Sequence, residues 1–250
     1  MENYNNSQIE PTVAYDVVTL PSNGVFYNKK SLKVSYLTAA DENILTSTNL
    51  SQSGELMDVL LQNKIQDKDI DVKQLAECDK QAIFIFLRNT AFGADYNFTL
   101  TDPSTGKQFD HTEDLSVIKT KEIKIKPDEK GQFSLDLPKS NKKVKLKLLT
   151  PQDQLDLEEL EKSYGDMKVK PMATKRLEKS IVSIDGETDS MTLSTSIHTL
   201  PIKDAQTIKK FLSEVQPGLD VTRTTTSPSG EEVTFSLNFG LNFFRPFFGL

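Results

Sequence analysis

The spacing of the hydrophobic residues changes several times along this chain, between the period of a helix and the period of a strand. Within Leu75–Phe86 the apolar residues recur at helical spacing, and Gly93 stands where a glycine commonly ends a helix. Within Phe133–Leu148 the apolar residues instead alternate with polar ones. A chain that carries both periods in separate blocks cannot form an all-helical bundle or an all-β sandwich. We therefore predict an α+β fold, a helical body with β-hairpin or β-meander ribbons.

Two helix starts carry the pattern of a capping box, with aspartate in place of the usual glutamate. Thr38 stands three residues before Asp41, and Thr150 stands three residues before Asp153, with Pro151 at the first helical position. With the apolar periodicity, these starts predict helices over residues 38–45, 54–62, 71–93, 150–164, 175–183 and 202–216.

Alternating residues between turn signals predict strands over residues 32–36, 96–100, 123–125, 133–137, 144–148, 221–226 and 233–237. We expect the three middle strands to form a meander with one apolar face and one lysine face. The turn at Asp102–Lys107 resembles the turn at Ser227–Glu231, and each follows a helical block. This similarity predicts a weak internal duplication, although so short a match also arises by chance.

These elements divide the chain into four expected parts. We predict a flexible N-terminal arm at residues 1–16, a helical block with a β-ribbon at 17–149, a second helical block with a β-hairpin at 150–238, and an aromatic C-terminal anchor at 239–250. The first twelve residues are polar and Asn-rich, unlike a signal peptide. No apolar run approaches the roughly 20 residues that a membrane span needs, so we expect no membrane association.

Residues that carry catalytic or metal chemistry are scarce. The chain has two histidines, His111 and His198, and a single cysteine, Cys78, in no ligand-like spacing. The glycines stand singly at turns, without a phosphate-binding loop or a serine elbow. We therefore predict no enzymatic activity, no metal or other cofactor, and no small-molecule substrate.

The charge is unevenly spread. The chain carries −6 overall, whereas Lys119–Lys147 has ten lysines against four carboxylates, a net +6 that leaves −12 for the remainder. A lysine face of this kind is either an ordinary solvated surface or a surface that docks a partner. It lacks arginine and interleaved aromatic residues, so nucleic-acid binding is the less favoured interpretation.

Aromatic residues concentrate at the C-terminus. Seven large apolar residues fall within the last twelve positions: Phe239, Leu241, Phe243, Phe244, Phe247, Phe248 and Leu250. Leaving them in water costs about 25 cal/mol per Å² of apolar area. They are covered either by the chain's own domain or by a neighbouring subunit, and we favour the neighbour, because Pro246 disfavours a regular helix or strand and Phe and Arg are favoured interface anchors.

Several segments together resemble a known family. Leu20–Tyr27, which reads Leu-Pro-Ser-Asn-Gly-Val-Phe-Tyr, is followed by Tyr36–Ser47, and this pair is similar to the N-terminal signature of the T-even-type (myovirus) phage baseplate hub family. Asp79 followed by Leu87–Asn89 and Gly93–Tyr96 adds to the resemblance, as does the ending Phe243-Phe244-Arg245-Pro246. The resemblance extends over most of the chain from Val17 onward.

The resemblance implies a structural or assembly component of a contractile tail baseplate, made in the bacterial cytoplasm and carried in the virion. Relatives carry a Cys-Pro-x-Cys-Gly knuckle in their β-ribbons, but here Asp102, Thr105 and Ser227 stand at cysteine positions. We therefore expect no zinc, with turn chemistry alone holding the ribbons.

Under this interpretation the partners are other phage baseplate and tail proteins. The alternatives are a transient assembly chaperone absent from the mature virion and a nucleic-acid-binding virion protein that uses the Lys119–Lys147 ribbon. Arg88 serves either an interface or an ion pair within its own fold. The predicted partner-binding residues are Pro21, Gly24, Phe26, Tyr27, Arg88, Phe243, Phe244, Arg245, Pro246, Phe247, Phe248 and Leu250.

Overall fold

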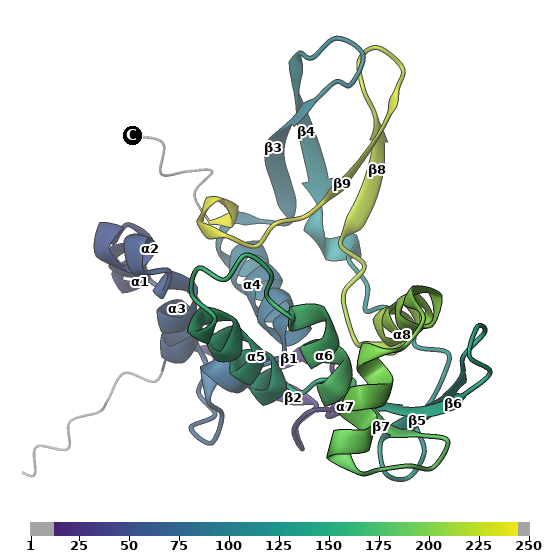
Figure 1. The fold of residues 1–250 in the computed structure, drawn as a ribbon. Coiled ribbons are helices and arrows are strands. Elements are labelled where there is room, and N and C mark those ends of the chain that lie inside the picture. Colours follow the sequence, from purple (N-terminus) through teal and green to yellow (C-terminus); the bar gives the residue numbers. More distant parts are fainter. Residues whose placement is uncertain (1–12, 245–250) are drawn as a thin grey trace, which may run out of the picture. The chain divides into compact units, whose positions relative to one another are not determined.

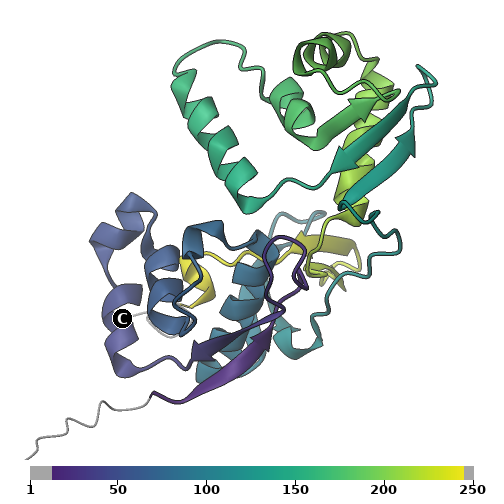
Figure 2. The ribbon, with the colours of Figure 1, turned by 90° about the horizontal axis from the view of Figure 1, so that it is seen from below.

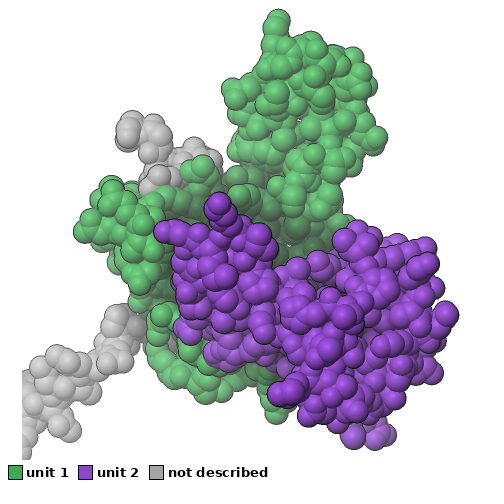
Figure 3. All heavy atoms as spheres, viewed as in Figure 1, with its two compact units in different colours: residues 1–119, 219–250 green, residues 120–218 purple. Residues whose placement is uncertain are grey.

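A computed structural model of the chain describes residues 13–244. Helices and antiparallel strands both occur throughout, which confirms the predicted α+β class. The chain forms two compact units (Figure 3), of which unit 1 contains residues up to 119 and from 219 onward, and unit 2 contains residues 120–218. The N–H of Asp220 donates to the carbonyl of Lys119 over 2.8 Å, so the chain leaves unit 1 and re-enters it at neighbouring positions.

Unit 1 begins with an antiparallel pair of strands, β1 (Tyr15–Thr19) and β2 (Ser31–Ser35), which Figure 2 shows in purple. Strand β1 was not predicted from the sequence, and its first two residues fall within the predicted flexible arm. The alternation in β1 is weak because only Val18 is buried, whereas Tyr15 and Val17 are exposed.

The helical part of unit 1 contains α1 (Ala39–Leu45), α2 (Thr48–Ser53), α3 (Leu56–Lys64), the short 3₁₀ helix η1 (Val72–Gln74) and α4 (Glu77–Phe92). The capping box at Thr38 and Asp41 is present as predicted. The Asp41 carboxylate also accepts a bond from the buried Lys64 ammonium over 2.5 Å, which ties α1 to α3. Helix α2 was not predicted, because none of its residues is buried and it carries no apolar stripe.

Two β-hairpins complete unit 1 (Figure 1). The first is β3 (Asp95–Thr101) with β4 (Gln108–Asp114), and the second is β8 (Thr222–Thr226) with β9 (Glu232–Ser236). Short 3₁₀ helices follow them, η2 (Leu115–Val117) and η3 (Leu241–Phe243). Both turns lie where the sequence predicts them, and β3, β8 and β9 match predicted strands, whereas β4 was not predicted. One hydrophobic core joins the elements of unit 1, and α4 supplies its centre with Ile83, Phe84 and Leu87.

Unit 2 contains a three-stranded antiparallel sheet in the order β5 (Gln132–Asp136), β6 (Lys143–Lys147), β7 (Ile181–Ile184). Its helices are α5 (Pro151–Ser163), α6 (Met172–Ser180), α7 (Ser190–His198) and α8 (Ile202–Val215). A separate core includes Val144, Leu146 and Ile208. The predicted strand at 123–125 is absent from this described part of the chain, and a helix predicted to reach residue 183 ends at Ser180.

The compact units do not follow the predicted blocks. A boundary at residues 149 and 150 would separate β6 from β7, although Val144 pairs with Ile184 and Leu146 pairs with Ile181. The hairpin β8–β9 likewise belongs with the N-terminal elements. The physical reason is that sheet pairing joins segments far apart in sequence, which local periodicity does not report.

Candidate partner-binding surfaces

The loop Leu20–Tyr27 is fastened to α4 by one buried carboxylate. The backbone N–H of Ser22 donates to Oδ1 of Asp79 over 2.8 Å, and the Ser22 hydroxyl donates to Oδ2 over 2.6 Å. The Tyr27 hydroxyl also donates to this carboxylate. Asn23 and Gly24 both have positive φ, which lets the loop turn tightly enough to present these donors. The segment that carries the resemblance therefore forms an internal lock with Asp79.

Hydrogen bonds offset the cost of burying the Asp79 carboxylate. Burial raises the pKa of Asp79, and the two bonds from Ser22 act in the opposite direction. Such a carboxylate is stable in the folded chain only while its oxygens keep their donors. Asp79 thus holds the loop in one conformation and is itself inaccessible, with 0% exposure.

The lock decides how much of the loop a partner could reach. Pro21 is buried within unit 1, so the prediction that it contacts a partner does not hold. Gly24, Phe26 and Tyr27 are half-buried, and the neighbouring Val25 is 55% exposed. A partner would therefore meet the turn after Ser22 and not its start.

Arg88 lies inside unit 1 with an exposure of only 1%. Its guanidinium donates to the carbonyls of Gly93 and Asp95, each over 3.2 Å, and lies over the rings of Tyr96 and Phe243. Burial lowers the pKa of Arg88, but an arginine remains charged. The prediction of an interface role is wrong for this residue, and among the described residues no carboxylate pairs with it either.

The aromatic residues near the C-terminus pack into the chain's own core. Phe243 and Phe244 are both 0% exposed. The Phe243 ring lies edge-on to Tyr96 with centroids 5.1 Å apart, and the Phe244 ring meets Phe84 at 5.9 Å. The predicted insertion into a neighbour therefore does not hold for these two rings, because unit 1 removes them from water itself. The predicted contacts of Arg245, Pro246, Phe247, Phe248 and Leu250 lie outside the described residues.

The two hairpins of unit 1 meet at their tips through Asp102. This carboxylate caps its own turn by accepting from the N–H groups of Ser104 and Thr105. It also accepts from Ser229 of the other hairpin, from the N–H over 3.1 Å and from the hydroxyl over 2.8 Å. Turn chemistry alone was expected to hold these ribbons, but contact between the turns adds to it. The sequence signal that could have revealed this contact was the similarity of the two turns.

Below the tips, an aromatic seam joins the hairpins. The Phe235 ring lies 5.2 Å from Phe98 and 5.1 Å from His111, measured between centroids. Nearer the base, Nε of Arg223 donates to Glu113 over 3.1 Å. Within residues 13–244 no three side chains of the metal-ligating kinds gather into a site. The hairpins thus form one supported arm, whose contacts are aromatic and hydrogen-bonded.

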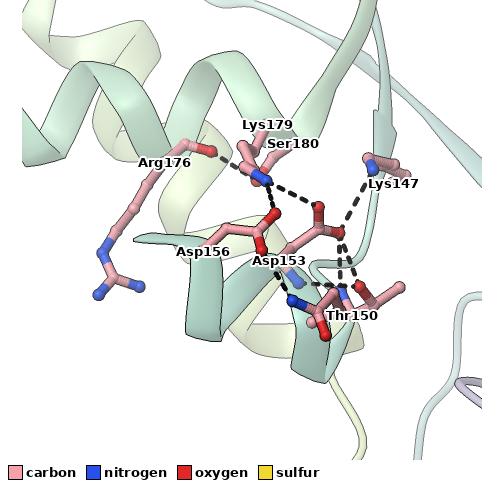
Figure 4. A network of polar contacts seen from close by, with 8 residues as sticks. Lys147, Thr150, Asp153, Asp156, Arg176, Lys179 and Ser180 are labelled. Atoms are coloured by element: carbon pink, nitrogen blue, oxygen red, sulfur yellow. Dashed lines mark hydrogen bonds and ion pairs between the residues drawn. The ribbon is translucent and has the colours of Figure 1, made fainter. Parts of the chain in front are cut away.

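The lysine face of β6 is smaller and more neutralised than the sequence suggested. Lys143 lies 3.9 Å from Asp136, and Lys145 lies 4.0 Å from Asp128. Lys147 reaches Asp153 over 3.3 Å, and Lys179 bridges Asp153 to α6 (Figure 4). Exposed pairs of this kind contribute little stability. They do place a carboxylate beside each lysine of the strand, which weakens its attraction for a polyanion.

A family model described as "T4 bacteriophage base plate protein" matches residues 12–245. No curated protein and no solved structure matches the chain. Across the described part of the chain, no helix is both long and apolar enough to cross a bilayer.

Proposed function

Because the chain belongs to the T4 bacteriophage base plate protein family, we propose that it is a non-enzymatic structural component of the hub region of a contractile tail, acting through contacts with other baseplate proteins. Its place is then the virion tail, after synthesis in the host cytoplasm. The proposal assigns no cofactor, no small-molecule substrate and no nucleic acid to the chain.

The observation that carries this proposal is how the buried polar groups are used. The buried polar groups hold elements of unit 1 together, and they are Asp79, Arg88 and the Asp41–Lys64 pair. In an active site, perturbed groups of this kind would converge on a cleft. Here each one stabilises a loop, a strand or a helix, which supports a scaffold whose surfaces, and not its interior, perform the function.

The last residues supply the first surface to test. Phe243 and Phe244 fix the end of the described chain in the core of unit 1, and the sequence beyond them continues as Arg245-Pro246-Phe247-Phe248-Gly249-Leu250. We propose that Phe247, Phe248 and Leu250 bind a neighbouring baseplate subunit.

Truncation at two positions tests the anchor. A chain that ends at Pro246 keeps both core rings, so we expect it to fold. Because it lacks the anchor, we expect it not to be incorporated into tails assembled in infected cells. A chain that ends at Asn242 loses the core rings and should be unstable on its own. The matched control is Val169→Ser, which alters a residue that is 80% exposed in unit 2. Normal incorporation of the chain ending at Pro246 would contradict the proposed anchor.

A further inference from the structure

Strand β1 has one open side. In an antiparallel pair, residues that exchange hydrogen bonds alternate with residues whose backbone groups point away from the partner strand. Tyr36 N–H donates to Ala14 and Leu20 N–H donates to Lys30, so even-numbered residues of β1 face β2. The N–H and C=O groups of Tyr15, Val17 and Thr19 therefore point to the opposite edge, where no described residue bonds to them.

Apolar side chains are exposed along this edge, together with the polar Asp16 and Thr19. Val13, Tyr15 and Val17 are 43%, 41% and 61% exposed. Val25, in the loop after β1, is also exposed, so four of the five exposed large apolar residues in the described part of unit 1 lie within residues 13–25. Lys33 extends over the Tyr15 ring at 5.5 Å from its centroid and borders the stripe.

The exposed residues of the hairpins and of β5 are polar, and β7, the other outer strand of the unit 2 sheet, has no exposed residue. The exposed residues of β3 and β4 are Asp, Asn, Thr and Gln, and those of β8 and β9 are Thr, Glu and Ser. Strand β5 exposes Ser134 and Asp136. Proteins commonly protect free strand edges with polar or charged residues, because an apolar edge invites another strand. On the face of β1 that carries Tyr15 and Val17, Thr19 is the one polar residue of the strand.

We infer that β1 is a self-association edge, at which the β1 strands of two copies pair antiparallel about a two-fold axis through Val17. This register places Val17 opposite Val17 of the second copy and Tyr15 opposite Thr19, with the outward N–H and C=O groups of all three exchanging bonds. Asp16 then faces Val18. Shifting the axis to Asp16 would set two carboxylates opposite each other, which is unfavourable across strands.

The geometry makes a second copy a suitable occupant. An isologous contact needs a surface that complements itself, and a strand edge with a central valine does so in both backbone and side chain. The resulting four-stranded sheet would cover Val17 and Tyr15 on both copies. This inference concerns the chain alone and does not depend on the proposed place in the baseplate.

Sedimentation of the full-length chain over a range of concentrations tests the inference. We expect a reversible dimer, and Val17→Pro should raise its Kd about 100-fold, because proline removes the N–H on the axis from both copies. The ladder with β2 should survive, because Val17 does not bond to β2, and circular dichroism would check this. Val117→Thr, which alters an exposed valine outside residues 13–25, should leave the Kd unchanged.

Cysteine crosslinking tests the register independently of stability. Val17→Cys places two thiols at a directly opposed pair, about 5.5 Å apart at Cα, which suits a disulfide. Thr19→Cys places them four residues out of register, about 13 Å apart. Oxidation should therefore link the first variant and not the second, and the native Cys78 is buried. A wild-type chain that stays monomeric, a dimer that survives Val17→Pro, or equal crosslinking of both variants would overturn the inference.

Discussion

Replacing Phe243 with alanine tests whether the C-terminal rings belong to the chain's own core. The ring is 0% exposed and contacts Phe239, Phe244 and Tyr96 at centroid distances of 5.0, 5.4 and 5.1 Å. Phe→Ala at a buried site costs about 3–5 kcal/mol. The Arg88 guanidinium also lies 5.6 Å from this ring, so truncation removes a cation–π contact as well. We expect a loss of about 4 kcal/mol in the free energy of unfolding of unit 1.

Urea denaturation of the isolated protein measures this loss. With a slope of about 2 kcal/mol per molar urea, the midpoint of unit 1 should fall by about 2 M. Because the chain has two compact units, hydrogen exchange read on peptides from α4 and from β6 would separate their stabilities. Phe243→Leu should cost less, since leucine refills much of the volume, and the β6 peptides should not change.

The result that would refute this reasoning is a loss below about 1 kcal/mol in the isolated chain. Phe243 would then have little contact with its own core, and insertion of its ring into a neighbouring subunit would again be the favoured interpretation. A large loss confined to unit 1 supports the packing that the structure shows.

Three further predictions concern the polar contacts. Lys64→Met should destabilise unit 1 by about 3–5 kcal/mol in urea titrations, because it leaves the Asp41 carboxylate buried without its cation; Lys210→Met, at an exposed pair, should change little. Thr150→Ala should cost about 0.5–2 kcal/mol in unit 2 through loss of the α5 cap, and Thr150→Ser should restore most of it. Burial alone would raise the pKa of Asp204, but its bonds from Ser140 and Lys139 outweigh burial and hold the pKa below its usual value. Its stabilising contribution should therefore be complete above about pH 4 and be lost as the pH falls further, and Asp204→Asn should flatten this acid limb of a stability–pH curve.

Local signals predicted local structure well. The capping boxes at Thr38 and Thr150 formed as the sequence indicated, because their bonds join residues only three positions apart. Both Pro-Ser turns also formed hairpins. Helices α2 and α7 were missed, since neither carries a continuous apolar stripe that would distinguish it from a loop.

Non-local structure was predicted less well. Strand β7 was taken as the end of a helix, because its β-branched residues gain their preference from pairing with β6, more than 30 positions earlier. The contact of Ser229 with Asp102 joins residues 127 positions apart and leaves no periodic signal. The need to cover Phe243 and Phe244 was evident from the sequence, but hydrophobicity does not distinguish the chain's own core from a neighbour.

Quantitative mass spectrometry of purified tails tests most directly whether this chain resides in the baseplate. We expect the protein to be present at a fixed whole number of copies per tail, unchanged after washing in high salt. Its absence from finished tails, with the protein found only in assembly intermediates, would contradict a resident structural role and favour a transient chaperone.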